Sequence, residues 1–216
     1  MKIAAARELK KGEALSVDNE VYNRFAATFP YAETDDQNKA IADVVEDMAS
    51  GRPMDRLVCG DVGFGKTEVA LRAAYVAAMD GAQVALIAPT TLLVRQHYMN
   101  FVERFKNTGL KIAQLSRFVT PRAAKATRDA MAKGEVNIVI GTHALLAKDV
   151  KFDHLGLMII DEEQRFGVKQ KERLKELREN VHILTLTATP IPRTLQMSLT
   201  GVKDMSIIAT PPVDRM

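Results

Sequence analysis

The sequence predicts an α/β fold in which a mostly parallel β-sheet carries helices on both faces. Short apolar stretches, typical of buried strands, alternate along most of the chain with longer stretches of helical periodicity. A strand, a helix and a further strand form a right-handed crossover, so this alternation produces parallel strands. With 216 residues, 47% of them hydrophobic, the chain can bury a sizeable core in one main domain.

The first predicted strand, at residues 56–59, leads into a glycine-rich stretch and then a helix at 68–79. The stretch fits G-x-x-x-x-G-K-[ST] at every fixed position. Glycines let backbone N–H groups turn inward, and a helix N-terminus favours an anion, so we expect a phosphate-binding loop. A glycine-rich turn without a ligand is the alternative. The stretch consists of Gly60, Asp61, Val62, Gly63, Phe64, Gly65, Lys66 and Thr67.

The chain ahead of this loop has helical patterns but no strand. Helices are expected at 2–11 and 18–28, as an N-terminal appendage or the end of a linker. Thr34 and Gln37 form a capping-box pattern that opens a helix to about residue 50, where Gly51 ends it. Capping is therefore one interpretation of Gln37.

After the loop the same alternation continues to the end of the chain. Because ligands of such sheets bind outside the carboxyl ends of the strands, the residues that follow each strand are the candidates for chemistry. Strands are expected at 83–88, 111–115, 136–140, 157–160, 182–186 and 205–208, and helices at 91–105, 120–134 and 169–179.

Carboxylates follow the apolar strand at 157–160 directly. Asp161 is placed to hold Mg²⁺, usually through water, together with Thr67 of the loop, while Lys66 would reach the β- and γ-phosphates. Glu162, one residue on, could accept a proton from an attacking water as general base. Ordinary helix capping is the alternative for these acidic residues.

Small hydroxyl residues follow two other strands. Thr187 and Thr189 could relay the state of the nucleotide to another surface, although Thr189 before Pro190 is also typical of a helix cap. At Gly141-Thr142-His143, the Gly-Thr backbone and the Thr142 hydroxyl could contact a phosphate, or the stretch could form a plain turn. No cluster of His, Cys or Asp accompanies His143, so the sequence indicates no metal there.

Charge along the chain is uneven. The formal net charge is only +3, but basic residues outnumber acidic ones ten to three between residues 91 and 148. This excess favours a nucleic-acid backbone as partner, read without sequence specificity because no base-reading motif is present. The single cysteine, Cys59, is expected in the core. The sequence has no membrane-spanning run or signal-peptide pattern, so a cytoplasmic location is expected.

Taken in order, these stretches resemble the motifs of superfamily 2 helicases. The residues within these motifs are most similar to those in the first motor lobe of bacterial transcription-repair coupling factors, with RecG-type branch-migration helicases as close relatives. The resemblance covers nearly the whole chain. The matching stretches are 60–67, 88–91 (Ala-Pro-Thr-Thr), 141–146 (Gly-Thr-His-Ala-Leu-Leu), 161–168 (Asp-Glu-Glu-Gln-Arg-Phe-Gly-Val) and 187–194 (Thr-Ala-Thr-Pro-Ile-Pro-Arg-Thr).

The resemblance implies a RecA-like lobe at 29–210, with residues 1–28 as the appendage and 211–216 as the start of an interlobe linker. It implies ATP and Mg²⁺ as cofactors, and as partners double-stranded DNA, a second RecA-like lobe and, through other domains, RNA polymerase. By the same resemblance Gln37 reads adenine, Phe29 stacks on it and Gln164 senses the γ-phosphate. Thr187 and Thr189 couple hydrolysis to DNA, and the residues that contact the DNA backbone are Thr90, Thr91, Arg117, Thr142 and His143.

Such motors complete their ATP site with arginines from the second lobe, which can be worth about 10³ to 10⁵ in rate. We therefore expect this chain alone to hydrolyse ATP very slowly or not at all. Three alternatives remain at this point: a RecG-type remodeller of branched DNA, a small-molecule kinase that uses the same loop, and a nucleotide-dependent binding module without catalysis.

Overall fold

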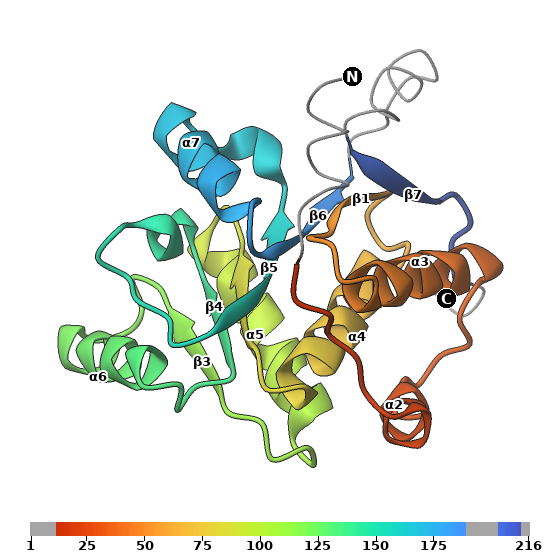
Figure 1. The fold of residues 1–216 in the computed structure, drawn as a ribbon, viewed down its shortest axis with the longest axis horizontal. Helices are drawn as coiled ribbons and strands as arrows, with labels where there is room; N and C mark the ends of the chain where they lie inside the picture. The colour runs from red at the N-terminus through yellow and green to blue at the C-terminus, as the bar shows by residue number, and fades with distance from the viewer. Residues whose placement is uncertain (1–11, 189–202, 213–216) are drawn as a thin grey trace.

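A computed structural model describes residues 12–188 and 203–212. Its centre is a seven-stranded sheet in the order β3-β4-β2-β5-β6-β1-β7, and all six strand pairs are parallel (Figure 1). The α/β prediction is confirmed. The strands are β1 (Asp55–Gly60), β2 (Gln83–Ile87), β3 (Ile112–Leu115), β4 (Ile138–Gly141), β5 (Leu155–Asp161), β6 (His182–Thr187) and β7 (Asp204–Ile208).

Helices cover both faces of the sheet because successive side chains of a strand point to opposite sides. In β2, Val84 and Leu86 pack with helices α2 to α5, while Ala85 and Ile87 pack on the other face with α6, α7 and a 3₁₀-helix, η1. The helices are α2 (Asn19–Ala26), α3 (Asp35–Ala49), α4 (Lys66–Met79), α5 (Thr91–Phe105), α6 (Pro121–Ala132) and α7 (Val168–Leu177), with η1 (His143–Leu146) and η2 (Glu163–Arg165).

Local capping signals fix most helix starts. Thr34 and Gln37 form the predicted capping box of α3, and Thr120 caps α6 with Pro121 at its first position. The predicted start of the helix after the loop was late by two residues, since α4 begins at Lys66. The two 3₁₀-helices were not predicted.

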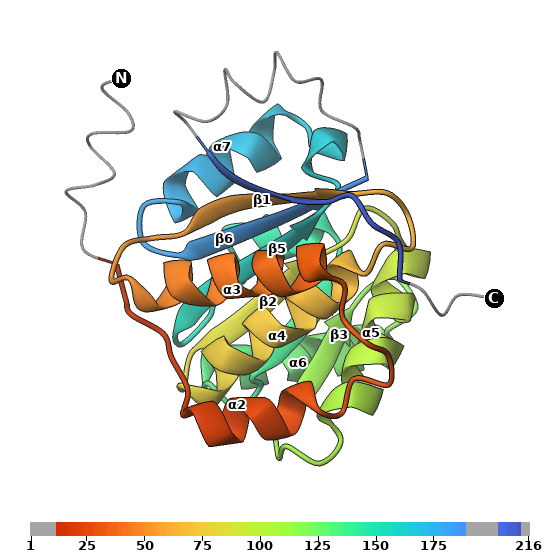
Figure 2. The same cartoon turned by 90° about the vertical axis from the view of Figure 1, so that its right-hand side faces the viewer.

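The segment ahead of the loop packs into the main core. Leu15 and Phe25 are 1% and 3% exposed, and the Phe25 ring stacks on Tyr75 of α4 with centroids 4.0 Å apart. Figure 2 shows α2 lying against the α4 layer. Residues 12–28 therefore share the core of the lobe. The helix expected at 2–11 falls outside the described residues, and the domain boundary at residue 28 stays a prediction.

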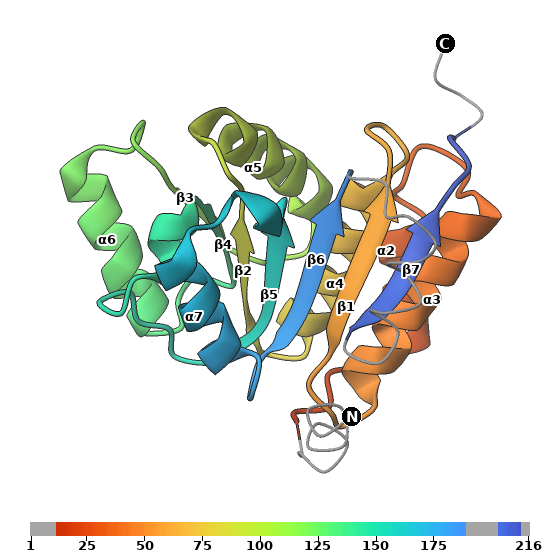
Figure 3. The ribbon, with the colours of Figure 1, turned by 90° about the horizontal axis from the view of Figure 1, so that it is seen from above.

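All seven strands point the same way, so their carboxyl ends form one edge (Figure 3). One half of this edge is formed by β5, β6 and β1, with β7 outermost, and the other by β2, β4 and β3. Cys59, near the end of β1, is buried as predicted, and burial raises the pKa of its thiol to about 11. Within the described residues, no helix combines the length and apolar character that a membrane crossing would require.

Candidate nucleotide-binding site

The loop between β1 and α4 takes a conformation that requires glycine. Gly63 and Gly65 have φ of 88° and 87°, a region that other residues rarely occupy. A Cβ atom at Gly65 would lie 1.8 Å from Nε2 of Gln37. Gly65 is therefore fixed both by its backbone angle and by the close approach of α3.

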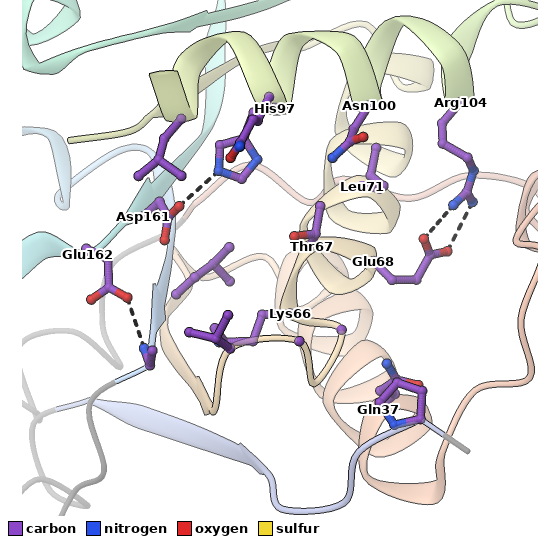
Figure 4. A pocket seen from close by; sticks show the side chains of 18 of the residues that line it. Gln37, Lys66, Thr67, Glu68, Leu71, His97, Asn100, Arg104, Asp161 and Glu162 are labelled. Carbon is purple, nitrogen blue, oxygen red and sulfur yellow. Dashed lines mark hydrogen bonds and ion pairs between the residues drawn. The ribbon is translucent and has the colours of Figure 1, made fainter. Parts of the chain in front are cut away.

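Lys66 opens α4 and lines the cavity beside the loop (Figure 4). Its ammonium donates to the backbone oxygens of Gly60 and Asp61, the latter at 3.0 Å. Burial lowers the pKa of Lys66, and the carboxylates of Asp161 and Glu162 partly oppose this shift. The lysine therefore lies in the electrostatic field of the acidic pair, on the same edge of the sheet.

The two carboxylates after β5 are held by different partners. Asp161 contacts His97 of α5, with 2.9 Å between Oδ2 and Nε2. Glu162 has φ and ψ of 60° and 60°, the left-handed region, and its Oε1 accepts the N–H of Ala188 at 3.1 Å. The same carboxylate accepts hydrogen bonds from Gln164 and, at 3.5 Å, from Thr187.

Glu163, the third carboxylate of the run, has its partners elsewhere. It accepts from Arg178 at 2.7 Å and from Lys203 at 3.0 Å. Burial alone would raise the pKa of Glu163, but the two cations outweigh it and lower that pKa. Asp161 and Glu162 line the cavity and Glu163 does not, so the acidic run divides between two environments.

A cavity of 1030 Å³ joins these groups. Its volume suits a nucleoside triphosphate. Val62, Gly63, Gly65, Lys66 and Thr67 line it, whereas Gly60, Asp61 and Phe64 of the same loop do not. Among the other predicted site residues, Phe29, Gln37, Asp161, Glu162 and Gln164 also line the cavity.

Gln37 is completely buried, and both ends of its amide are occupied. Oε1 accepts the N–H of Thr34 at 2.9 Å, and Nε2 donates to the backbone oxygen of Phe64 at 3.0 Å. The capping interpretation is thus confirmed, and the same side chain supports the phosphate loop. Its adenine contact, and the stacking of Phe29, stay predictions.

A buried ionic network beside the cavity was not anticipated. Glu68 is 3% exposed and accepts from Arg72 at 2.8 Å and from Arg104 at 3.0 Å. The Arg104 guanidinium also lies 5.6 Å from the centre of the Phe29 ring. A cation over an aromatic face is attractive, so this network supports one wall of the cavity.

His97 was also missed, although the sequence carried a signal. The buried positions of α5 are Val94, His97, Phe101 and Phe105, which places a histidine on the apolar side of an amphipathic helix. A polar residue there needs a partner. The partner, Asp161, lies 64 residues away along the chain and could not be identified from local pattern.

The residues predicted to contact DNA lie on the other half of the edge and do not line the cavity. Thr90 caps α5, Thr91 opens it, and Thr142 precedes η1. Thr90, Arg117 and His143 are exposed. Pairing of Gly141 with both Ile87 and Leu115 brings these three strand ends side by side.

Two further predictions concern the coupling and linker segments. Thr187 is buried and reaches Glu162, whereas Thr189 falls outside the described residues. At the expected linker, Asp36 accepts the N–H groups of Ala209 and Thr210, both at 3.0 Å, and Pro212 lines the cavity. Residues 213–216 are not among those described.

The donor set fits Mg²⁺ better than a metal held by protein alone. Thr67 and Asp161 line one cavity, and no group of three or more His, Cys, Asp or Glu in the described part of the chain could form a metal site. Mg²⁺ is usually bound by one or two carboxylates together with waters and substrate phosphates. One carboxylate and one hydroxyl therefore suffice here.

Comparison with known proteins agrees with this geometry. Residues 34–198 match the family described as DEAD/DEAH box helicase. The chain belongs to this helicase family. A helicase domain implies nucleotide binding, and the phosphate loop at residues 60–67 lies within the matched range.

Relatives of this helicase chain are similar over its whole length. Transcription-repair-coupling factors of Haemophilus influenzae and Bacillus subtilis are 57% and 56% identical to it, over 99% and 100% of the chain. The chain spans about a fifth of their length, 19% and 18%. RecG bound to a three-way DNA junction superimposes with a TM-score of 0.84 at 35% identity, covering 100% of this chain and 29% of RecG.

Proposed function

We propose that this chain is the ATP-binding first lobe of a motor that moves on double-stranded DNA. One observation carries the proposal: the phosphate loop and the acidic pair face a single cavity, with Lys66 close enough to Asp161 and Glu162 for their charges to interact. Carboxylates on the far edge of the sheet would have excluded a shared ion.

The residues have separate tasks in this proposal. Loop N–H groups and Lys66 hold the β- and γ-phosphates, which requires the ammonium to exchange its carbonyl partners for phosphate oxygens. Thr67 and Asp161 would hold Mg²⁺, which neutralises charge on the phosphates when bound. Gln37 and Phe29 would face the adenine.

Glu162 is suited to the proton-transfer step. Water attacks the γ-phosphorus, the bond to the ADP oxygen breaks, and the proton of the water passes to Glu162. The Ala188 N–H bonds to Oε1 at 3.1 Å and so fixes the direction of the carboxylate. Because Gln164 and Thr187 bond to the same carboxylate, Gln164 could sense the γ-phosphate while Thr187, with Thr189, couples hydrolysis to DNA.

The wider function rests on similarity. The relatives at 57% and 56% identity are transcription-repair-coupling factors, which favours displacement of a stalled RNA polymerase through domains beyond this chain. In this proposal residues 29–210 form the lobe, 1–28 an appendage whose residues 12–28 pack into the core of the lobe, and 211–216 the start of a linker to a second lobe. A RecG-type remodeller of branched DNA is the second candidate, supported by the RecG structure at 35% identity.

Titration of the chain with a fluorescent ATP analogue in the presence of Mg²⁺ tests the nucleotide site. Lys66→Ala should weaken binding by about 10- to 100-fold, because charge-assisted hydrogen bonds to phosphate are worth about 1.5–3 kcal/mol. The thermal midpoint should stay unchanged. Lys39→Ala, which removes an exposed lysine that does not line the cavity, should bind as the wild type does. A Lys66→Ala variant that unfolds would instead indicate a structural lysine.

A further inference from the structure

His97 lies beside the acidic pair at the carboxyl edge of the sheet. It belongs to α5, is 8% exposed and lines the same cavity as the phosphate loop. Figure 4 shows the imidazole pointing from α5 toward Asp161, and Nε2 lies 2.9 Å from Oδ2. This contact joins α5 to the carboxyl end of β5.

We propose that His97 is a positioning residue for the magnesium site. It donates its Nε2–H to Oδ2 of Asp161, so that Oδ1 would remain available to a bound Mg²⁺. The inference rests on the proposed function, because it assumes that Asp161 serves the metal.

The physical reason lies in the freedom of an aspartate side chain. The last torsion of aspartate is broad, so a carboxylate at a strand end samples several orientations unless a partner selects one. A carboxylate accepts hydrogen bonds, and the imidazole nitrogen is therefore the donor. Carboxylates that serve a metal are usually hydrogen-bonded in turn, and loss of such a partner commonly weakens metal affinity 10- to 100-fold.

The imidazole is itself held in place. Its neighbours on the buried side of α5, Val94 and Phe101, are both 0% exposed, so the ring has little room to turn. A buried donor locked by packing fixes its acceptor better than an exposed side chain does. A histidine with a purely structural role could be buried in the same way. Only the response to Mg²⁺ therefore distinguishes a structural role of His97 from a role in positioning Asp161.

The test measures how the affinity of the 216-residue chain for a fluorescent ATP analogue depends on Mg²⁺. Titrations in EDTA and across a range of Mg²⁺ concentrations give the Mg²⁺ level that half-saturates the enhancement of binding. His97→Leu should raise this level about tenfold. In EDTA its nucleotide affinity should stay within about twofold of the wild type.

Two amide variants keep the test informative if His97→Leu folds poorly. The amide nitrogen of His97→Gln can reach the place of Nε2 and should restore the wild-type Mg²⁺ dependence to within about threefold. The shorter side chain of His97→Asn places its nitrogen near Nδ1 and should behave as His97→Leu does. His154→Gln, at a half-exposed histidine that contacts Glu13 outside the cavity, is the matched control.

An equal Mg²⁺ requirement in the wild type, His97→Gln and His97→Asn would overturn the positioning role while leaving the proposed function standing. A wild-type chain whose nucleotide binding ignores Mg²⁺ would overturn both. The two failures are therefore distinguishable in one set of titrations.

Discussion

The two halves of the carboxyl edge are built differently. At the ends of β1, β5 and β6, polar side chains bond across elements far apart in the chain, as His97 does with Asp161 and Gln37 does with Phe64. At the ends of β2, β4 and β3, the hydroxyl of Thr90 caps its own helix at 3.2 Å from Leu93 N, and Arg117 and His143 are exposed.

This difference fits two different tasks. A site that hydrolyses a triphosphate has to hold donors and carboxylates within a fraction of an ångström before the ligand arrives. Contact with a nucleic-acid backbone requires mainly accessible cations and donors, because charge dominates that affinity. Mutations in the nucleotide half should therefore change the geometry of the site and the stability of the fold. Mutations in the other half should change only the charge available for binding nucleic acid.

The largest expected effect is on the rate of ATP hydrolysis at the nucleotide half of the edge. We expect the chain alone to hydrolyse ATP about 10³- to 10⁵-fold more slowly than a longer protein that includes the proposed second lobe, because arginines from such a lobe would stabilise the transition state. Single-turnover hydrolysis measures both. Glu162→Gln in the longer protein should remove about 10²- to 10⁴-fold of the rate and keep nucleotide binding. Equal rates for the chain and the longer protein would contradict the two-lobe proposal.

Gly65→Ala tests the close packing of the nucleotide half. Its Cβ would meet Gln37 at 1.8 Å, so we expect a loss of about 2–5 kcal/mol in the free energy of unfolding, from left-handed strain and overpacking together. Gly109→Ala, near β3, has a similar φ of 76° but open space, and should cost only about 1–2 kcal/mol. Urea unfolding measures both variants.

A double variant makes the Gly65 test sharper. If the clash is with the Gln37 amide, Gly65→Ala combined with Gln37→Ala should cost less than the sum of the two single changes. Additive costs would show that the two residues do not oppose each other.

His182, at the amino end of β6, should make stability depend on pH. Nδ1 accepts the Met54 N–H at 2.9 Å, Nε2 donates to the Glu13 oxygen at 2.6 Å, and burial lowers the pKa of the ring below its ordinary value of 6.5. The folded state thus favours the neutral ring. The stabilisation that the neutral ring contributes is complete above about pH 6.5 and is lost as pH falls toward the pKa of His182 in the folded state. The free energy of unfolding then decreases by no more than about 1.4 kcal/mol per pH unit.

Urea unfolding at several pH values between 5 and 8 checks this expectation. His182→Asn can keep the acceptor for Met54 but cannot be protonated in this range, so its stability should vary less with pH. A wild type and a His182→Asn variant with the same pH dependence would rule out His182 as the titrating group.

The smallest effect on stability is expected in the half of the edge formed by β2, β4 and β3. Arg117→Ala in a longer protein with both lobes should reduce the salt dependence of duplex binding by about one unit of slope, as expected for one lost phosphate contact. Its free energy of unfolding should change by less than about 0.5 kcal/mol. Arg52→Ala, an exposed arginine at the amino edge, should leave duplex binding unchanged. A strong loss of stability in Arg117→Ala would remove the contrast between the halves.

Much of the fold was predictable because its signals are local. Thr34, Thr90 and Thr120 each cap the helix that follows, and the glycines of the phosphate loop adopt the angles that their pattern requires. Those residues of the cavity that directly follow a strand in the sequence were also predictable. The side chains that hold the cavity residues in place were not predictable, because the partners are distant in the chain. Arg104 and Glu68 are 36 residues apart, and His97 and Asp161 are 64 residues apart.

The sequence by itself determined the chemistry: a phosphate loop at Lys66, an acidic pair at Asp161 and Glu162, and the alternation that makes every strand parallel. Tertiary structure decided which strands become neighbours, and it placed β1 and β5 on either side of β6 although they are far apart in the chain. It also gave Glu162 a left-handed backbone and gave Asp161 its histidine. The reason is physical, since pairing and burial depend on the energy of the whole packed molecule, whereas caps and turns depend on a few adjacent residues.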